Sequence, residues 1–285
     1  MSLETLDPDS VERALVEYGA LSVTLSDGGD EPLLEPAPGE TPLWTDTRIT
    51  ALFDAGIDLD ALPGYLASVL NTDRLPAYGT ENLADRAWER EWLRDFGPMQ
   101  FGKRLWILPG DQPEPAGDAI TVRLDPGLAF GTGTHATTAL CLEWLDGLEL
   151  DGKRVFDFGC GSGILGIAAL KLGAASVDAI DIDLQAITAT RQNAERNGVA
   201  DRMAVSSSLP SDDAGYDLVV ANILAGTLIE QANLIVAATA DGGRVALSGI
   251  LNAQADEVMA AFGDRVAFAP AATRDEWVML SGTRN

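Results

Sequence analysis

A glycine-rich turn is the part of this sequence best suited to bind a small molecule. Residues 155–166 read VFDFGCGSGILG and place glycines at positions 159, 161, 163 and 166. Glycine permits a tight turn and lets a ligand reach the backbone without meeting a Cβ atom. The turn joins an apolar strand to an apolar helix, where ligands of parallel α/β sheets bind. The sequence therefore predicts a binding site at Gly159, Gly161 and Gly163.

Two nucleoside ligands fit such a turn. Gly161-x-Gly163-x-x-Gly166 matches the dinucleotide fingerprint. The glycines begin earlier, however, as Asp157-x-Gly159-x-Gly161-x-Gly163, which is the usual pattern of S-adenosylmethionine sites. A sulfonium nucleoside also has no pyrophosphate that needs a helix N-terminus. We therefore predict S-adenosylmethionine as the cofactor rather than NAD(P).

Acidic residues follow the next predicted strand, in the run Ile180-Asp181-Ile182-Asp183. A carboxylate at the end of this strand can accept hydrogen bonds from both ribose hydroxyls. One of the two aspartates could instead cap the helix that follows. Because Asp183 directly precedes that helix, we assign the cap to Asp183 and ribose binding to Asp181.

Asn222 is the predicted catalytic residue and a further cofactor-binding residue. It ends a strongly apolar strand and is followed by Ile-Leu-Ala. Its side-chain carbonyl can accept a hydrogen bond from an amine and aim the nitrogen lone pair at a methyl group. The alternative is that Asn222 only caps the following helix.

An apolar, glycine-rich loop lies upstream, between residues 124 and 138. We expect it to close on the ligand and assign Phe130, Gly131 and Thr132 to cofactor binding. A phosphate cradle is the competing interpretation, but the lysine of a P-loop is missing. His135 is the only histidine of the chain, and it either accepts a proton or orders the loop. No metal ligands are expected, since the spacing of the cysteines and the histidine matches no zinc pattern.

The order of predicted elements indicates two domains. After residue 119, strands and helices alternate, which predicts a parallel sheet covered on both faces. Strands at 266–268 and 277–280 have no helix between them and must pair antiparallel. The proline-rich segment 109–118 predicts a linker, which gives the domains 1–108 and 119–285. Residues 101–108 are expected to form one strand, and residues 83–96 a helix, in an N-terminal α+β domain.

Composition limits the partners of this chain. It has 19 basic and 44 acidic residues, a net charge of −25. Such a surface repels phosphate backbones, so we expect no direct nucleic-acid binding. The acidity either keeps the protein soluble in a salty cell interior or steers a basic partner to it. No apolar run is long enough to span a membrane, and we see no secretory signal, so we expect a cytoplasmic protein.

Several longer segments resemble one bacterial family, ribosomal protein methyltransferase A (PrmA), which modifies protein eleven of the large ribosomal subunit. The resemblance lies in DPGLAFGTGTHATTALCLEWLD, DFGCGSGILGIAALKLGA, AIDIDLQAITATRQNAERNGV, VVANILAGTL and LSGIL. It spans residues 119–285 and extends more weakly over 88–92 and 101–108. It departs at Ala136, where the family is expected to have proline, and in the extreme acidity of the chain.

The resemblance implies the following expectations. Thr138, Gly159, Asp181 and Asn222 would bind the methyl donor. Residues 119–285 would form a Rossmann-like class I methyltransferase domain with a seven-stranded sheet that ends in an antiparallel hairpin. Residues 1–108 would form a ferredoxin-like substrate-recognition domain. The substrate would be a large-subunit ribosomal protein, methylated on lysine side chains and its N-terminal amine. The alternatives are a methyltransferase of another protein or small amine, and a non-catalytic S-adenosylmethionine-binding module.

Overall fold

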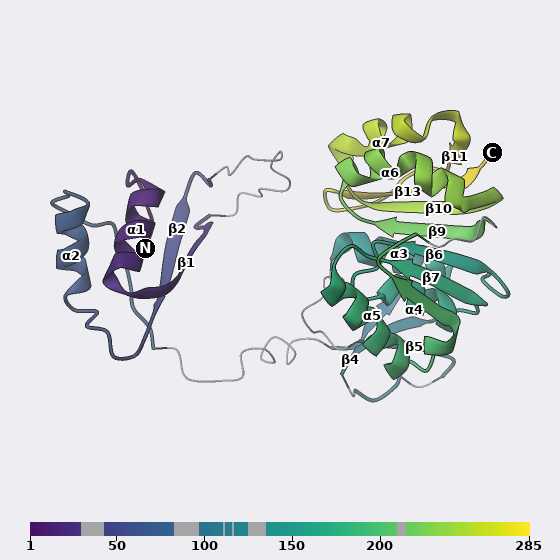
Figure 1. Ribbon diagram of the computed structural model, residues 1–285, viewed down its shortest axis with the longest axis horizontal. Coiled ribbons are helices and arrows are strands. Elements are labelled where there is room, and N and C mark those ends of the chain that lie inside the picture. Colours follow the sequence, from purple (N-terminus) through teal and green to yellow (C-terminus); the bar gives the residue numbers. More distant parts are fainter. Residues whose placement is uncertain (30–42, 83–96, 111, 116, 125–134, 210–214) are drawn as a thin grey trace. The chain divides into compact units, whose positions relative to one another are not determined.

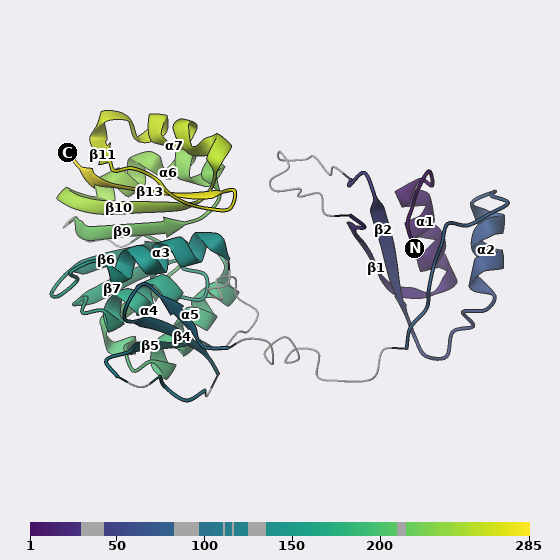
Figure 2. The same cartoon turned by 180° about the vertical axis from the view of Figure 1, so that it is seen from behind.

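The computed structural model describes residues 1–29, 43–82, 97–110, 112–115, 117–124, 135–209 and 215–285. The helix predicted over 83–96 therefore lies outside the described residues. The chain divides into two compact units, Met1–Arg86 and Ala87–Asn285. Figures 1 and 2 show the elements of each unit from opposite sides.

The first unit has helices packed on a small antiparallel sheet. Asp7 caps the first helix, because its Oδ2 accepts a hydrogen bond from the Ser10 backbone N–H at 3.0 Å. Leu3, Val11 and Ile49 belong to the buried apolar core. These elements make an α+β unit, and the ferredoxin-like topology stays a prediction. The elements are α1 (Pro8–Tyr18), β1 (Ala20–Asp27), β2 (Thr47–Phe53) and α2 (Leu62–Val69).

The second unit is built on a large twisted sheet. Seven strands follow the order β11-β13-β10-β9-β6-β7-β8, and β12 pairs with β13. The strands from β8 to β10 are parallel, whereas β13 is antiparallel to both β10 and β11. The predicted parallel sheet with an antiparallel C-terminal hairpin is thus confirmed, and β12 adds an eighth strand to the seven that were predicted. The strands are β6 (Arg154–Phe158), β7 (Ser176–Ile180), β8 (Met203–Ser206), β9 (Tyr216–Asn222), β10 (Thr239–Leu251), β11 (Val266–Phe268), β12 (Ala272–Arg274) and β13 (Trp277–Arg284).

Helices cover both faces of this sheet, because successive apolar side chains of a strand point to opposite faces. Leu218 and Val220 of β9 face the core that contains α3 and α4. Val219 and Ala221 face the second core, which contains α6 and α7. A buried parallel sheet of this kind explains the nearly continuous apolar strands of the sequence. The helices are α3 (Ala136–Asp146), α4 (Ile164–Lys171), α5 (Leu184–Arg196), α6 (Ala225–Ala238) and α7 (Ala255–Phe262).

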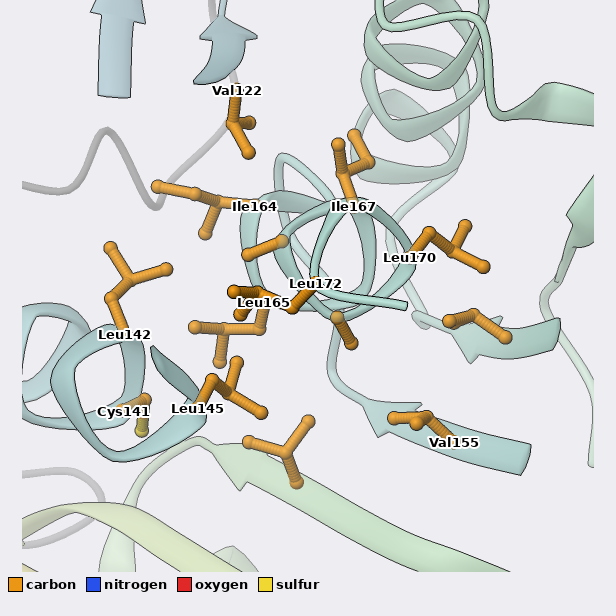
Figure 3. Close-up of a cluster of buried hydrophobic side chains, with 14 of the residues drawn as sticks. Val122, Cys141, Leu142, Leu145, Val155, Ile164, Leu165, Ile167, Leu170 and Leu172 are labelled. Atoms are coloured by element: carbon orange, nitrogen blue, oxygen red, sulfur yellow. The ribbon is translucent and has the colours of Figure 1, made fainter. Parts of the chain in front are cut away.

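Helix α4 is buried on every side. Figure 3 shows it nearly end-on, with apolar side chains pointing in all directions. Leu142 and Leu145 of α3 lie on one side, Val155 of β6 on another, and Val122 of β5 (Ile120–Leu124) on a third. A helix that is apolar all round belongs in a core. This burial fixes the position of the glycine turn from which α4 starts.

A second, smaller sheet covers the outer side of α4. β3 (Met99–Phe101) is antiparallel to β4 (Leu105–Pro109), and β4 is parallel to β5. The single strand expected over 101–108 is therefore two strands, since Gly102 turns the chain with a φ of 66°. Phe101 and Leu105 share one core with the large sheet, so this smaller sheet belongs to the second unit.

The division between the units thus differs from the sequence-based boundary at 109–118. The structure assigns β3 and β4 to the unit Ala87–Asn285, rather than to an N-terminal domain ending at residue 108. The physical reason is strand pairing across the proline-rich segment: Leu105 to Pro109 pair with Ile120 to Leu124. Composition identifies residues 109–118 as a connection, but it does not reveal that the flanking strands pair with each other.

Candidate active site

The glycine turn has the backbone that the sequence requires. Gly159, Gly161 and Gly163 have φ values of 77°, 54° and 80°, in the left-handed region that other residues rarely adopt. A Cβ atom on Gly159 would collide with Cγ2 of Ile223. A Cβ on Gly163 would lie 2.7 Å from Cγ2 of Thr190. Both conformation and space therefore demand glycine at positions 159 and 163.

Asp181 lies beside this turn at the carboxyl end of β7. Its Oδ2 accepts a hydrogen bond from the Gly161 N–H at 2.9 Å, and its Oδ1 accepts one from the Asp183 N–H at 2.9 Å. Each carboxylate oxygen has a second lone pair, so both can still accept a ribose hydroxyl. Asp183 caps α5 by accepting from the Gln185 N–H at 2.8 Å, which confirms its predicted role.

Exposed apolar side chains flank Asp181 and Asn222. Ile182 is 97% exposed and Leu184 is 70% exposed, directly after β7. Leu224 is 60% exposed directly after β9. All three lie at the edge of the sheet where its parallel strands end, which suits the flat, apolar face of an adenine ring or a substrate stem. Our sequence analysis missed them, although apolar residues just beyond strand ends were the available signal.

A buried carboxylate stands behind the turn. Asp157 is 1% exposed, and its Oδ2 accepts a hydrogen bond from the Gly166 N–H at 2.9 Å. Burial raises the pKa of Asp157 from 3.8 to about 7, the Gly166 hydrogen bond opposes this rise, and the nearby charge of Asp181 adds to it. Asp157 thus links β6 to the first turn of α4 and holds the glycine turn in shape.

Asn222 ends β9 and contacts a residue far away in sequence. Its Nδ2 donates a hydrogen bond to Oγ1 of Thr138, in the first turn of α3, at 3.1 Å. Helix α6 begins only at Ala225, and its N-cap residue is Leu224, without a side-chain cap bond. The alternative role of Asn222 as a helix cap is therefore wrong. With Nδ2 donated to Thr138, the Oδ1 atom remains an acceptor, as an amine-positioning residue requires.

The structure brings together most of the predicted site residues. Gly159, Gly161 and Asp181 meet at adjoining strand ends, and Thr138 meets Asn222. Phe130, Gly131 and Thr132 lie outside the described residues.

Other chemistries find little support in the described part of the chain. Burial raises the pKa of both Cys141 and Cys160 to about 12, so neither thiol is ionised near neutral pH. The described residues contain no group of three or more His, Cys, Asp or Glu side chains placed to hold a metal ion. They also contain no helix that is both long and apolar enough to cross a membrane.

The sheet order, the antiparallel β13, the glycine turn after β6 and the acidic residue after β7 define a class I S-adenosylmethionine-dependent methyltransferase. The residues present fit the donor, because the glycine turn has the left-handed backbone of the motif and Asp181 keeps two free lone pairs for a ribose. Comparison with known protein families identifies the particular methyltransferase family to which the chain belongs. The model of "Ribosomal protein L11 methyltransferase (PrmA)" matches residues 2–285, and the chain belongs to this family.

Individual relatives agree over nearly the whole chain. A ribosomal protein L11 methyltransferase of Edwardsiella ictaluri is 54% identical over 280 residues, which cover 96% of this chain and 94% of the relative. One from Escherichia coli O81 is 51% identical and covers 97% and 95%. A crystal structure of the ribosomal protein L11 methylase from Lactobacillus delbrueckii subsp. bulgaricus has a TM-score of 0.61 and 34% identity, and covers 66% of this chain and 99% of that one.

Proposed function

We propose that this enzyme transfers methyl groups from S-adenosylmethionine to lysine side-chain amines and the N-terminal amine of ribosomal protein L11. One observation supports amine transfer most directly. The Asn222 amide lies at the end of β9, and its Nδ2 donates a hydrogen bond to Thr138. Its Oδ1 therefore remains available to accept a hydrogen bond from an N–H of the substrate amine. The names of the relatives supply the substrate.

The bound donor supplies an electrophilic methyl group on a sulfonium. The chain contributes alignment of the amine nitrogen with that methyl group, which lowers the barrier without a covalent enzyme intermediate. We assign the donor nucleoside to the glycine turn and to Asp181, and the amine to Asn222. Exposed Ile182 suits the adenine ring, and exposed Leu224 suits the methylene stem of a lysine.

The amine has to lose a proton before it attacks. At pH 7 this costs about 4.6 kcal/mol for a lysine with a pKa of about 10.4, and about 1.4 kcal/mol for an N-terminal amine with a pKa near 8. Desolvation lowers that cost because it disfavours the ammonium form. Nδ1 of His135 contacts Thr137 Oγ1 at 2.8 Å in the first turn of α3, which supports a structural role of His135 over that of proton acceptor.

We assign substrate recognition to the first unit. A cavity of about 420 Å³ lies in it, lined mainly by apolar residues that include Ile49, Leu52 and Ile57, with Asp54 and Glu81 also on its wall. Residues 1–86 contain seventeen acidic and four basic residues, a net charge of −13. Such a surface complements a protein that binds RNA and is therefore basic. The charge also supports an enzyme that does not itself bind nucleic acid. Because the proposed substrate is a ribosomal protein, we also propose a cytoplasmic location.

Two matched variants test this recognition role. Leu52→Lys places a charge on the cavity wall, whereas Leu21→Lys places the same charge at a residue that is 67% exposed and outside the cavity lining. We expect only Leu52→Lys to raise the KM for L11, with donor affinity unchanged in both. Equal KM values would show that the cavity does not contact the substrate.

The proposed activity is tested with isotope-labelled S-adenosylmethionine and large-subunit proteins from cells that lack this methylation. We expect label on L11 alone, on lysines and on the N-terminal amine, identified by mass spectrometry. Label on another protein would keep the donor site and overturn the substrate. A KM for L11 that rises steeply with salt would favour electrostatic steering over salt adaptation as the reason for the acidity.

A further inference from the structure

The orientation of the Asn222 amide depends on Thr138. If the amide were turned by 180°, its oxygen would face Thr138 and its nitrogen would face the site, which would remove the acceptor that an amine needs. The 3.1 Å bond from Nδ2 to Thr138 Oγ1 selects the productive orientation. Thr138 is fully buried in the first turn of α3. Whatever holds this turn in place therefore also holds Asn222.

His135 holds the turn as its N-cap residue. Its Nδ1 accepts from the Thr137 N–H at 3.4 Å and lies 2.8 Å from Thr137 Oγ1. Histidine is not among the residues preferred at N-caps, where Ser, Thr, Asp and Asn predominate. A histidine at this position offers a ring that can pack against a neighbouring side chain as well as an acceptor for the cap.

The strand ends that surround Asn222 support the same turn. The His135 ring lies edge-on to the Trp277 ring, with centroids 4.8 Å apart. Ser248 Oγ donates to the Thr137 carbonyl oxygen at 3.1 Å, and the Ile223 N–H donates to the Ser248 carbonyl oxygen at 3.1 Å. The first turn of α3 is thereby connected to β13, to β10 and to the residue directly after Asn222.

We infer that His135 is a positioning residue for methyl transfer. Its ring, packed on Trp277, caps α3 through Thr137 and keeps Thr138 where it orients the Asn222 amide. This inference rests on the proposed function, because it concerns the amine acceptor of that reaction. It assigns His135 no contact with the substrate and no proton transfer.

The test compares His135→Ala with His135→Asn at saturating donor and L11. Asparagine retains a side-chain acceptor for the Thr137 N–H, and alanine does not. We expect His135→Ala to lower kcat about tenfold or more while KM for L11 changes less than about threefold, since misplacing a positioning group affects the rate rather than binding. We expect His135→Asn to restore most of kcat. Asn233→Ala, which removes the outer contact of α6 with Arg265, is the control that loses a helix contact without losing kcat.

A double-mutant cycle tests the route. Thr138→Val removes the oxygen that Asn222 bonds but keeps the shape of the side chain. If His135 acts through Thr138, adding His135→Ala to Thr138→Val lowers kcat little further, because the two losses affect the same hydrogen bond. Fully additive losses, an unchanged kcat in His135→Ala, or a loss that His135→Asn does not restore would each overturn the inference.

A readout without substrate separates this inference from the proposed function. We expect the Asn222 side-chain amide protons, followed by nitrogen-15 NMR, to exchange slowly in the wild type and in His135→Asn but rapidly in His135→Ala. Similar exchange in all three proteins would overturn the positioning role even if L11 is the substrate. Inactivity of the wild type on L11, with the expected exchange pattern, would overturn the substrate alone.

Discussion

The two halves of the active site are built in different ways. The donor half lies within residues 159–183, and its contacts are backbone groups around the single carboxylate of Asp181. The transfer half joins Asn222 to Thr138, 84 residues earlier, through one side-chain hydrogen bond. In the proposed site, a local motif thus holds the donor-binding groups together, whereas the placement of Asn222 depends on distant segments packing together.

This difference predicts separable defects. Changes in the donor half are expected to weaken donor binding, and changes in the transfer half to lower the rate at saturating donor. Four predictions follow from that contrast, beginning with the largest effect.

Asn222→Ala removes the amide from the transfer half. We expect kcat to fall about a hundredfold to a thousandfold, because the amine loses its acceptor, while the Kd for S-adenosylmethionine changes only a few-fold. Single-turnover kinetics and calorimetry measure the two quantities. Asn233→Ala, in the outer contact of α6 with Arg265, serves as the control with normal kcat. Full activity in Asn222→Ala would remove the distinction between the halves.

Asp181→Ala removes the carboxylate from the donor half. Two lost hydrogen bonds to a charged acceptor correspond to about a hundredfold weaker donor binding, with kcat at saturating donor much less affected. Asp183→Ala is the matched control, because it costs α5 its cap, about 1 kcal/mol, but keeps both the Asp181 carboxylate and the backbone N–H at position 183 that bonds it. Equal donor affinities of the two variants, measured by calorimetry, would contradict the ribose assignment.

Gly159→Ala tests the glycine turn itself. The new Cβ would meet Ile223 Cγ2 at a φ of 77°, so we expect a loss of about 1–3 kcal/mol in stability and a roughly tenfold weaker donor affinity. Gly198→Ala also sits at a positive φ of 66°, but nothing lies within 4 Å of its Cβ position. It should lose stability by strain alone and keep donor affinity. Denaturant unfolding and donor titration separate the two effects.

Asp157→Asn tests the buried carboxylate behind the turn. Because the folded pKa is raised from 3.8 to about 7, the folded chain holds a proton between these values that the unfolded chain has lost. The contribution of this group to the free energy of unfolding is therefore complete below pH 4. It falls by at most on the order of 4 kcal/mol as the pH rises to about 7, and it is constant above that pH. The stability of the asparagine variant should therefore rise relative to that of the wild type as the pH increases from about 4 to about 7. A stability difference that does not vary with pH, measured by denaturant unfolding without donor, would contradict this burial effect.

Sequence reasoning performed best where one short segment decides the structure. The apolar strands, the glycine turn and the cap at Asp183 all follow from neighbouring residues, and the structure confirms them. It performed worst where the structure depends on which strands pair with each other. The break at Gly102 and the pairing of β4 with β5 place residues 99–109 in the second unit, which composition alone does not show.

The sequence by itself determined the class of fold and the local structure of the proposed donor half, because backbone conformation and strand burial depend on local residue types and their spacing. Only the tertiary structure decided which partner the Asn222 nitrogen takes, how His135 caps α3 and where the two units divide. Those features depend on contacts between segments far apart in the chain. Close packing brings such segments together, and no local pattern of residues specifies which distant side chains will meet.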